Sequence, residues 1–186
     1  MCTFVAKETI AHYLEGGGLV YGALLDATKA FDRIEYCRLF KLLIDRGLPP
    51  ICLRFLMNLY SCNLVCVAWH GICSPYFTAR NGVKQGGILS PVLFCIYFDG
   101  LLLRLHESKL GCWVASVYAG ALAYADDLVL LAPTPTAMRR MLEICDKYAN
   151  DFCIQFNASK SRCIVFRSHN VSTVRPIFSI AGNDKL

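Results

Sequence analysis

The chain has 186 residues, of which 55% are hydrophobic and only 18% are charged, so an intrinsically disordered protein is excluded. This length suffices for one domain with a sizeable core. The formal net charge of +5 at pH 7 suits a polyanionic partner such as a nucleic acid. The N-terminal segment carries charges where a secretory signal would be apolar, which predicts an intracellular protein, cytoplasmic or nuclear, that is not secreted.

Two further classes of protein are disfavoured by the sequence. The longest apolar window, residues 88–105, contains Pro91, Asp99 and Arg104, which interrupt it too often for a membrane span. The eleven cysteines lie among aliphatic residues and are predicted to be reduced core residues. One group resembles a zinc knuckle, with the spacing C-x3-C-x3-H-x2-C, but it fits no standard zinc pattern and lies in a strand-like segment. Its members are Cys62, Cys66, His70 and Cys73.

Hydrophobic periodicity and turn residues predict the elements of the first half of the chain. In chain order they are a helix at 3–15, a buried strand at 19–26, helices at 35–46 and 51–60, and a hairpin at 63–79. The glycines at 16–18 end the first helix, and His70-Gly71 is typical of the turn of the hairpin.

The second half mixes helices and strands without a regular alternation. The predicted elements are a glycine-rich loop at 80–89, a helix at 90–107, strands near 112–118 and 121–132, a helix at 134–151, and short strands at 153–156 and 163–166. Ser90-Pro91 is typical of an N-cap followed by proline at the first helical position. The tail shows no closing element. The irregular order predicts an α+β fold.

Two adjacent carboxylates, Asp126 and Asp127, stand at the bend between two apolar strands in "GALAYADDLVLLA". Two such charges about 4 Å apart repel by roughly 4 kcal/mol at an effective dielectric constant of 20. A bound cation relieves this repulsion, and an oxygen-only site suits a hard divalent ion such as Mg²⁺. The alternative is a plain hairpin turn, because Asp is common in turns.

A third carboxylate, Asp26, also ends a buried apolar strand, in "GALLDATKAFDRI". If the two strand ends are neighbours in one sheet, the three carboxylates converge. Such a cluster can hold two Mg²⁺ ions about 3.5–4 Å apart, which clamp the attacking and leaving oxygens of phosphoryl transfer.

Three segments, "ALLDATKAFDRI", "NGVKQGGILSPVLF" and "AYADDLVLLA", occur in the order of the core motifs of reverse transcriptases. They are most similar to those of non-LTR (LINE-type) retrotransposons, and "FNASKSRCIVF" resembles the further Asn-x-x-Lys motif of that family. The match extends over about residues 4 to 180. The resemblance therefore implies an RNA-directed DNA polymerase with a palm fold, in which an antiparallel sheet carries the catalytic carboxylates and is backed by helices.

The resemblance assigns the catalytic roles residue by residue. Asp26 and Asp126 match the metal-binding aspartates, and Asp127 matches the third active-site carboxylate. The backbone carbonyl of Ala27 adds a metal ligand, with two Mg²⁺ ions as the implied cofactors and Mn²⁺ as a substitute. Lys160 matches the lysine that protonates the leaving pyrophosphate; its alternative reading is a solvated loop lysine.

Two aromatic residues take positions that the family uses around the primer and the sugar. Phe31 matches the aromatic residue that lies under the deoxyribose and excludes a 2′-hydroxyl, although most Phe residues are simply core residues. Tyr124 matches a residue that supports the primer end, and its alternative is a packed strand aromatic. Lys29 and Asp32 are given no role.

The segment "NGVKQGGILSP" supplies the remaining predicted contacts. Gln85 matches the family glutamine that contacts the incoming nucleotide and the template, and Lys84 is predicted to contact phosphate. Gly86 and Gly87 let the backbone approach a ligand closely, so that their N–H groups can bind phosphate or template. The family often has Cys-Pro or Gly-Val where this chain has Gly87-Ile88, which is a conservative departure. Ala123 stands where many relatives have glycine before the Tyr, and the hairpin is expected to tolerate it.

The implied partners are an RNA template, a DNA primer and deoxynucleoside triphosphates. Residues 1–186 are expected to form a single palm-centred domain truncated at both ends, without the complete fingers and thumb or the endonuclease domain of a full-length element protein. The isolated chain is therefore expected to be inactive. The alternatives are an inactive relic of such an element and a group II intron-type reverse transcriptase. An RNA-dependent RNA polymerase is disfavoured by the absence of Gly-Asp-Asp and by the aromatic residue at Phe31.

Overall fold

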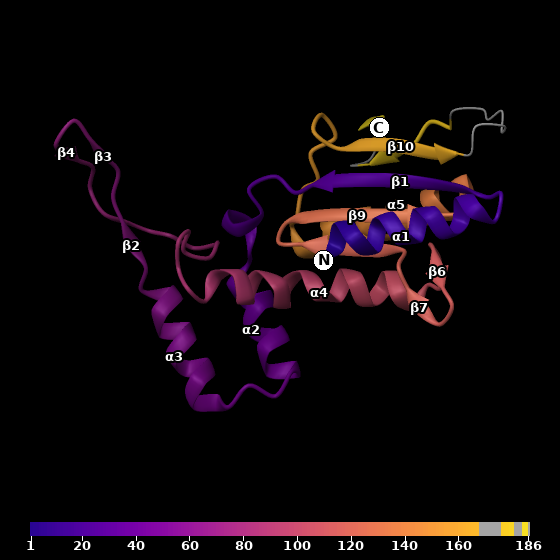
Figure 1. Cartoon of the computed structure of the whole chain (residues 1–186). Helices are drawn as coiled ribbons and strands as arrows, with labels where there is room; N and C mark the ends of the chain where they lie inside the picture. Colours follow the sequence, from indigo (N-terminus) through magenta and orange to yellow (C-terminus); the bar gives the residue numbers. More distant parts are fainter. Residues whose placement is uncertain (168–175, 181–183, 186) are drawn as a thin grey trace. The chain divides into compact units, whose positions relative to one another are not determined.

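The structure is a computed structural model that describes residues 1–167, 176–180 and 184–185. The chain divides into two compact units, one of residues 1–28 with 98–186 and one of residues 29–97 (Figure 1). The helix α4 (Ser90–Glu107) contributes its N-terminal part to the second unit and its remainder to the first. The prediction of one palm-centred domain over residues 1–186 stays a prediction.

A four-stranded antiparallel sheet forms the centre of the first unit (Figure 1). Its strands, in spatial order, are β10 (Arg162–Arg167), β1 (Leu19–Asp26), β9 (Asp127–Ala132) and β8 (Ala121–Tyr124). The strand β1 lies inside the sheet and is apolar on both faces, since Val20, Ala23 and Leu25 are all buried. This agrees with the predicted buried strand at 19–26 and places the end of that strand beside β9.

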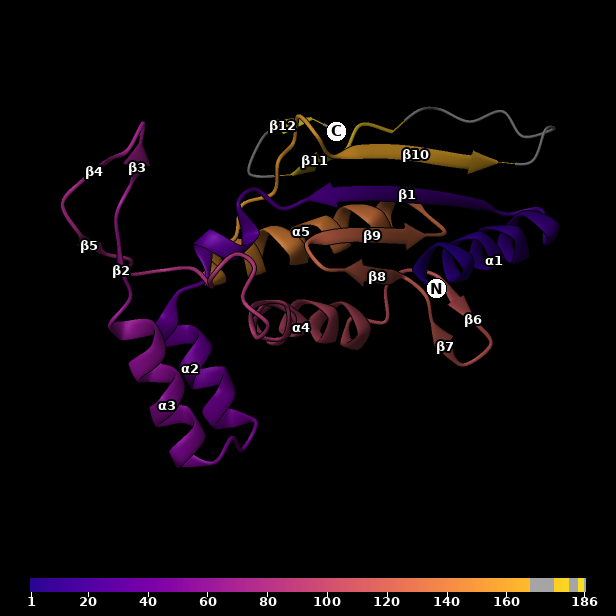
Figure 2. The same ribbon diagram turned by 60° about the vertical axis from the view of Figure 1, so that its left-hand side comes forward.

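One helix covers each face of this sheet (Figure 2). The helix α1 (Cys2–Glu15) packs Ala6 and Ile10 against a cluster that contains Val20 and Leu131. The helix α5 (Pro135–Phe152) contacts β1 and β9 with its apolar face. That face consists of Met138, Met141, Leu142, Cys145, Tyr148 and Ala149. The Thr134 side chain accepts a hydrogen bond from the backbone N–H of Ala137 at 3.2 Å, which fixes where α5 begins.

Two short hairpins complete the described part of this unit. The first pairs β6 (Trp113–Val114) with β7 (Val117–Tyr118), and the second pairs β11 (Ser179–Ile180) with β12 (Asp184–Lys185). The second pair corrects the expectation that the tail contains no further element. The predicted α+β class is confirmed, because helices and an antiparallel sheet share one unit without regular alternation.

The second unit begins with a 3₁₀ turn, η1 (Ala30–Arg33), followed by α2 (Tyr36–Asp45) and α3 (Pro50–Ser61). A long hairpin then pairs β2 (Leu64–Val65) with β5 (Phe77–Thr78) and β3 (Ala68–Trp69) with β4 (Ile72–Cys73). His70 and Gly71 have φ values of +46° and +82°, as a two-residue hairpin turn requires, and the predicted turn is confirmed.

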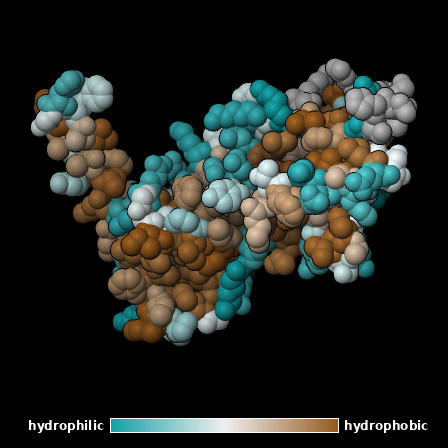
Figure 3. Space-filling view, in the orientation of Figure 1, coloured by the Kyte–Doolittle hydropathy of each residue, from teal (hydrophilic) through white to brown (hydrophobic). Residues whose placement is uncertain are grey.

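Apolar side chains are exposed on α2 and α3, where hydrophobic residues gather on the visible face (Figure 3). The large exposed residues there include Ile44, Ile51, Phe55 and Met57. The high hydrophobic content of the chain therefore supplies uncovered apolar surface as well as core. None of the described helices is long and apolar enough to cross a membrane.

Two further predictions, one about a strand and one about cysteine burial, were wrong. Residues 153–156 do not form a strand, because Cys153 has φ +53° and ends α5 in the left-handed region; only Phe156 makes an isolated bridge, to Ala27. The cysteines are all free, as predicted, but only Cys112 and Cys145 are buried. Six cysteines are exposed: Cys37, Cys52, Cys62, Cys73, Cys95 and Cys153. Cys52 and Cys73 adjoin the exposed Ile51 and Ile72, so at these two positions the aliphatic neighbour belongs to uncovered apolar surface rather than to the core.

Candidate active site

Strand register brings two of the predicted carboxylates together in the first unit. Asp26 is the last residue of β1, Asp127 is the first residue of β9, and the two are direct partners in the antiparallel pair. Side chains directly opposite each other point to the same face of a sheet, with Cβ atoms about 4.5–5.5 Å apart. Like charges at that separation destabilise the pair unless a cation offsets them.

The turn between β8 and β9 sets this register. Tyr124 pairs with Asp127, so that the connection consists of Ala125 and Asp126 alone. Ala125 has φ +54°, the left-handed conformation that a two-residue hairpin turn needs. Asp126 is half-buried within this turn, whereas Tyr124 is 75% exposed. The predicted bend is therefore present, but only Asp126 lies in it, because Asp127 already belongs to the strand.

A basic group faces Asp26 from the turn that follows α5. The Lys160 Nζ lies 3.8 Å from Asp26 Oδ2, and the lysine side chain is 67% exposed. The turn itself is shaped by Asn157, whose Oδ1 accepts hydrogen bonds from the backbone N–H groups of Ser159 and Lys160, at 3.1 and 3.3 Å. Asn157 therefore shapes this turn, as Asn side chains commonly do.

The same turn is fastened to the backbone of Asp26 on both sides. The N–H of Asn157 donates to the Asp26 carbonyl at 2.8 Å, and the N–H of Asp26 donates to Ser161 Oγ at 3.2 Å. The N–H of Thr28 donates to the Gln155 carbonyl at 2.7 Å. The bonds of Asp26 and Thr28 on either side of Ala27 form the β-bridge between Ala27 and Phe156. The Ala27 carbonyl oxygen takes no part in this bridge.

The carboxylate oxygens of Asp26, Asp126 and Asp127 and the backbone carbonyl oxygen of Ala27 are hard donors of the kind that Mg²⁺ prefers. Asp26 and Asp127 fit such an ion, since they are opposed on one face of the sheet. Among the residues that the structure describes, however, no three His, Cys, Asp or Glu side chains are grouped closely enough to hold a metal. Asp126 therefore does not form such a group with Asp26 and Asp127, and neither do the cysteines and the histidine of residues 62–73.

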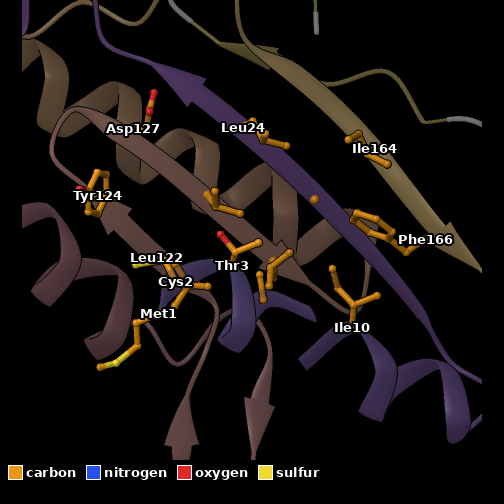
Figure 4. A pocket seen from close by; sticks show the side chains of 14 residues that line it. Met1, Cys2, Thr3, Ile10, Leu24, Leu122, Tyr124, Asp127, Ile164 and Phe166 are labelled. Atoms are coloured by element: carbon orange, nitrogen blue, oxygen red, sulfur yellow. The ribbon is translucent and has the colours of Figure 1, made fainter. Parts of the chain in front are cut away.

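An apolar groove of about 540 Å³ opens beside the carboxylates, between α1 and the facing side of the sheet (Figure 4). Leu24, Ile164 and Phe166 line it from β1 and β10, and Tyr124 and Asp127 lie at one end (Figure 4). Sequence reasoning did not predict this groove, because it depends on where α1 lies against strands that are distant in sequence.

The other predicted site residues lie in the second unit. The ring of Phe31 lies 5.0 Å from the ring of Phe94, and its backbone carbonyl accepts a hydrogen bond from the N–H of Val83 at 2.8 Å. Phe31 is the second residue of the 3₁₀ turn η1, whose N-cap Lys29 has φ +50°. The side chain is half-buried, so one part of the ring packs and another part is accessible.

The glycine-rich loop forms a tight turn before α4. The N–H of Gly87 donates to the Lys84 carbonyl at 2.9 Å, and the Ser90 hydroxyl donates to the same carbonyl. A side chain at Gly87 would lie 2.9 Å from Ser90 Oγ, and Gly86 has φ +78° with open space around it. Lys84 and Gln85 are exposed on this turn. The Ser90 hydroxyl therefore holds the loop, a role that its predicted N-cap position did not indicate.

The comparisons with known proteins identify the family. A family model described as "Reverse transcriptase (RNA-dependent DNA polymerase)" matches residues 3–176. The chain belongs to the reverse transcriptase family. The order and spacing of the four sequence motifs predicted this membership, and the relatives agree with the predicted non-LTR type.

The chain matches only part of the length of two curated relatives. It is 34% identical over 140 residues to the "Retrovirus-related Pol polyprotein from type-2 retrotransposable element R2DM" of Drosophila melanogaster, covering 75% of this chain and 13% of the relative. It is 30% identical over 167 residues to the Pol polyprotein of a type-1 retrotransposable element R2 of Popillia japonica, covering 85% of this chain and 27% of the relative. The chain thus spans far less than two thirds of either relative.

A solved structure with the same fold is the apo telomerase of Candida tropicalis truncated from its C-terminal domain. Its TM-score is 0.68 at 14% sequence identity, and the match covers 97% of this chain and 37% of the telomerase chain. At this identity the likeness shows the fold alone. It agrees with the predicted polymerase palm, in which an antiparallel sheet is backed by helices.

Proposed function

We propose that the chain is the palm-centred part of an RNA-directed DNA polymerase of a non-LTR retrotransposon, which adds deoxynucleotides to a primer 3′-hydroxyl on an RNA template. The observation that carries this proposal is the pairing of Asp26 with Asp127 at the ends of adjacent strands, with Lys160 beside Asp26. Family membership supplies the reaction class, and the carboxylate pair supplies the chemistry that this reaction needs.

The carboxylates of Asp26 and Asp127 and the Ala27 carbonyl would hold two Mg²⁺ ions, or Mn²⁺ in their place, and Asp126 would complete the set by turning its carboxylate toward them from the adjoining turn. When bound, these ions stabilise charge on the transferring phosphoryl group and favour ionisation of the primer 3′-hydroxyl. The protein contributes positioning. The strand register holds Asp26 opposite Asp127, and the two-residue turn holds the backbone of Asp126 between β8 and β9.

Lys160 would act as a proton donor to the leaving pyrophosphate. Its ammonium is ion-paired with Asp26 and largely exposed, so the charge is available to a triphosphate that approaches from solvent. The turn held by Asn157 fixes the lysine backbone next to Asp26. A cationic donor at this place both attracts the triphosphate and neutralises the charge that develops on the leaving group.

The nucleotide would be bound by residues of the second unit. Phe31 would stack under the deoxyribose and exclude a 2′-hydroxyl, Gln85 would contact the nucleotide and template, and Lys84 would contact phosphate. The N–H group of Gly86 would bind the nucleotide, and that of Gly87 the template. Tyr124, exposed at the hairpin of the first unit, would support the primer end. All of the net positive charge lies in residues 29–97, which carry eight Lys and Arg against three Asp and Glu, and this favours a polyanionic ligand there.

The full reaction would also require other parts of the element protein, since the chain spans only part of its relatives. Fingers, thumb and an endonuclease domain are the proposed partners within the same polyprotein. With an RNA template and a DNA primer, the reaction would take place inside the cell, in the cytoplasm or the nucleus.

Primer extension tests the proposal. Residues 1–186 are joined to the fingers and thumb of an R2 relative, and deoxynucleotide incorporation on a primed RNA template is measured with Mg²⁺ and with Mn²⁺. The proposal expects synthesis that disappears with Asp126→Asn and survives with Asp45→Asn, an exposed residue at the end of α2. If the fusion is inactive while the relative's own protein extends the primer, the chain is an inactive relic.

A further inference from the structure

Backbone hydrogen bonds tie η1 and the residue that follows it to the glycine-rich loop in the second unit. The N–H of Val83 donates to the Phe31 carbonyl and the N–H of Gly82 donates to the Ile34 carbonyl, both at 2.8 Å. Glu35 and Asn81 form a bridge at the outer end of this contact. Residues 31–35 and 81–85 are therefore one fastened assembly, although about fifty positions separate them in the sequence.

Gly82 is the point of closest approach in this assembly. Its φ is +85°, and a side chain there would lie 2.9 Å from the Cα and 3.0 Å from the carbonyl oxygen of Asp32. Real Cβ atoms do not approach backbone atoms so closely, so only glycine lets the loop pass over Asp32. The position of Asp32 relative to the loop is thus fixed by main-chain atoms rather than by flexible side chains.

A side-chain hydrogen bond continues the contact. Gln85 Nε2 donates to Asp32 Oδ1 at 3.2 Å. An ionised carboxylate can only accept, so the amide must turn its NH₂ group toward Asp32 and its Oε1 in another direction. Because both backbones are already held by the bonds of Val83 and Gly82, this interaction mainly selects one orientation of the glutamine amide.

We propose that Asp32 is a positioning residue, which holds the Gln85 amide in one orientation and so presents its Oε1 acceptor to the incoming nucleotide and template. The inference rests on the proposed function of Gln85 in nucleotide binding and deepens it. Asp32 does not touch the reacting atoms in this scheme. Its effect on the reaction passes through Gln85, and an amide free to rotate would present donor and acceptor groups indiscriminately.

The hydrogen bond itself is measured without any catalysis. In a ¹⁵N-labelled protein, the side-chain NH₂ signal of Gln85, assigned by its loss in Gln85→Ala, should be shifted from the position of a freely solvated glutamine amide, because the NH₂ group donates to the Asp32 carboxylate. The shift should vanish in Asp32→Ala and remain in Asp45→Ala, a matched exposed aspartate of the same unit. Asp32→Asn retains an acceptor oxygen, so its NH₂ signal should stay close to that of the wild type at neutral pH.

The consequence for the reaction is measured with the active fusion by a double-mutant cycle. Asp32→Ala should raise the KM for deoxynucleotides by roughly 3- to 30-fold, with a smaller change in kcat, and should increase misincorporation. Asp32→Ala added to Gln85→Ala should have little further effect, because the residue acts through Gln85. Asp32→Asn should recover most of the lost affinity, whereas a purely electrostatic role for the charge would leave it impaired.

The outcomes separate this inference from the proposed function. Additive effects of Asp32→Ala and Gln85→Ala, or an unchanged KM and error rate in Asp32→Ala, overturn the positioning role even if primer extension is robust. A fusion that fails to extend a primer overturns the proposed function and with it the role of Asp32 in catalysis, and the NH₂ signal then still decides whether the hydrogen bond exists.

Discussion

Asp26 and Asp127 are direct partners at the ends of β1 and β9, so strand pairing alone places two carboxylates side by side on one face of the sheet. The nearby cation within the described part of the chain is the exposed ammonium of Lys160, 3.8 Å from Asp26. An exposed ion pair of this length offsets little of the repulsion. The metal-free protein therefore carries a local electrostatic cost at its candidate active site.

We expect Asp127→Asn to stabilise the metal-free protein, because it removes one of two like charges that are directly opposite across the sheet. The free energy of unfolding should rise by about 0.2–1 kcal/mol. Urea unfolding in the presence of a chelator measures it, with Asp45→Asn as the control. The difference should shrink at high salt, where exposed charges are screened. A less stable Asp127→Asn protein would show that the carboxylate makes a favourable contact instead.

Asp126→Asn should greatly reduce the activity of the fusion with fingers and thumb but leave its fold unchanged. The substitution keeps the size of the turn residue but removes a charged oxygen ligand, so incorporation should fall by roughly 10²-fold or more. Circular dichroism should show unchanged secondary structure. Retention of most of the Mg²⁺-dependent activity would mean that Asp126 is only a turn residue.

Phe31→Val should let the active fusion accept ribonucleotides, because a smaller side chain clears space for a 2′-hydroxyl. The ratio of deoxy- to ribonucleotide incorporation should fall by roughly tenfold or more. Phe31→Tyr keeps the ring and serves as the control. If the ratio is unchanged in Phe31→Val, Phe31 is only a packing residue, whose ring centroid lies 5.0 Å from that of Phe94.

Cysteine alkylation should divide the thiols by burial. Burial raises the pKa of the Cys112 thiol to about 12 and that of Cys145 further, so both stay protonated and shielded near pH 8. Iodoacetamide followed by mass spectrometry should find these two unmodified in the folded protein, while exposed thiols such as Cys52 react. Equal reactivity of all eleven thiols in native buffer would contradict the buried positions.

The same raised pKa predicts a loss of stability in alkali. Well below pH 9 the Cys112 thiol is neutral in both the folded and unfolded states, so its contribution to stability is fully present. As the pH rises from 9 toward 12, the unfolded thiol ionises and the folded thiol does not, which favours unfolding. Cys112→Ala should flatten this part of the stability profile.

The hydrophobic pattern and the turn residues of the sequence were sufficient to predict those strands and turns that are determined by residues adjacent in the chain. The run at residues 19–26 is apolar on both faces and formed the predicted strand, and His70-Gly71 formed the predicted turn. The pairing of Asp26 with Asp127 needed one further assumption, that the two strands are neighbours. The strand order supports that assumption, although it was argued from chemistry and resemblance rather than from pattern.

Long-range relationships were beyond the reach of the sequence. Asp32 was given no role, because its partner Gln85 lies more than fifty residues away and the contact depends on the loop crossing at Gly82. The predicted strand at residues 153–156 failed for the opposite reason. There the helix end at Cys153 overrode a β-favouring composition, and only the bridge of Phe156 to Ala27 remained.

The crossing at Gly82 can be tested against a glycine that shares its conformation but not its surroundings. Gly82 and Gly47 have φ values of +85° and +75°, and a side chain at Gly47 would meet nothing within 4 Å. Gly47→Ala should therefore cost only the backbone strain of the left-handed region, about 1 kcal/mol.

Gly82→Ala should cost clearly more, roughly 2–4 kcal/mol of unfolding free energy, since the added methyl group also collides with the Asp32 backbone. If the loop moves away instead of unfolding, the Gln85 NH₂ signal should move to the position that it has in Asp32→Ala, and the KM for deoxynucleotides should rise as it does in Asp32→Ala. Equal stability losses in Gly82→Ala and Gly47→Ala, with the Gln85 signal unchanged, would show that the loop does not press on Asp32.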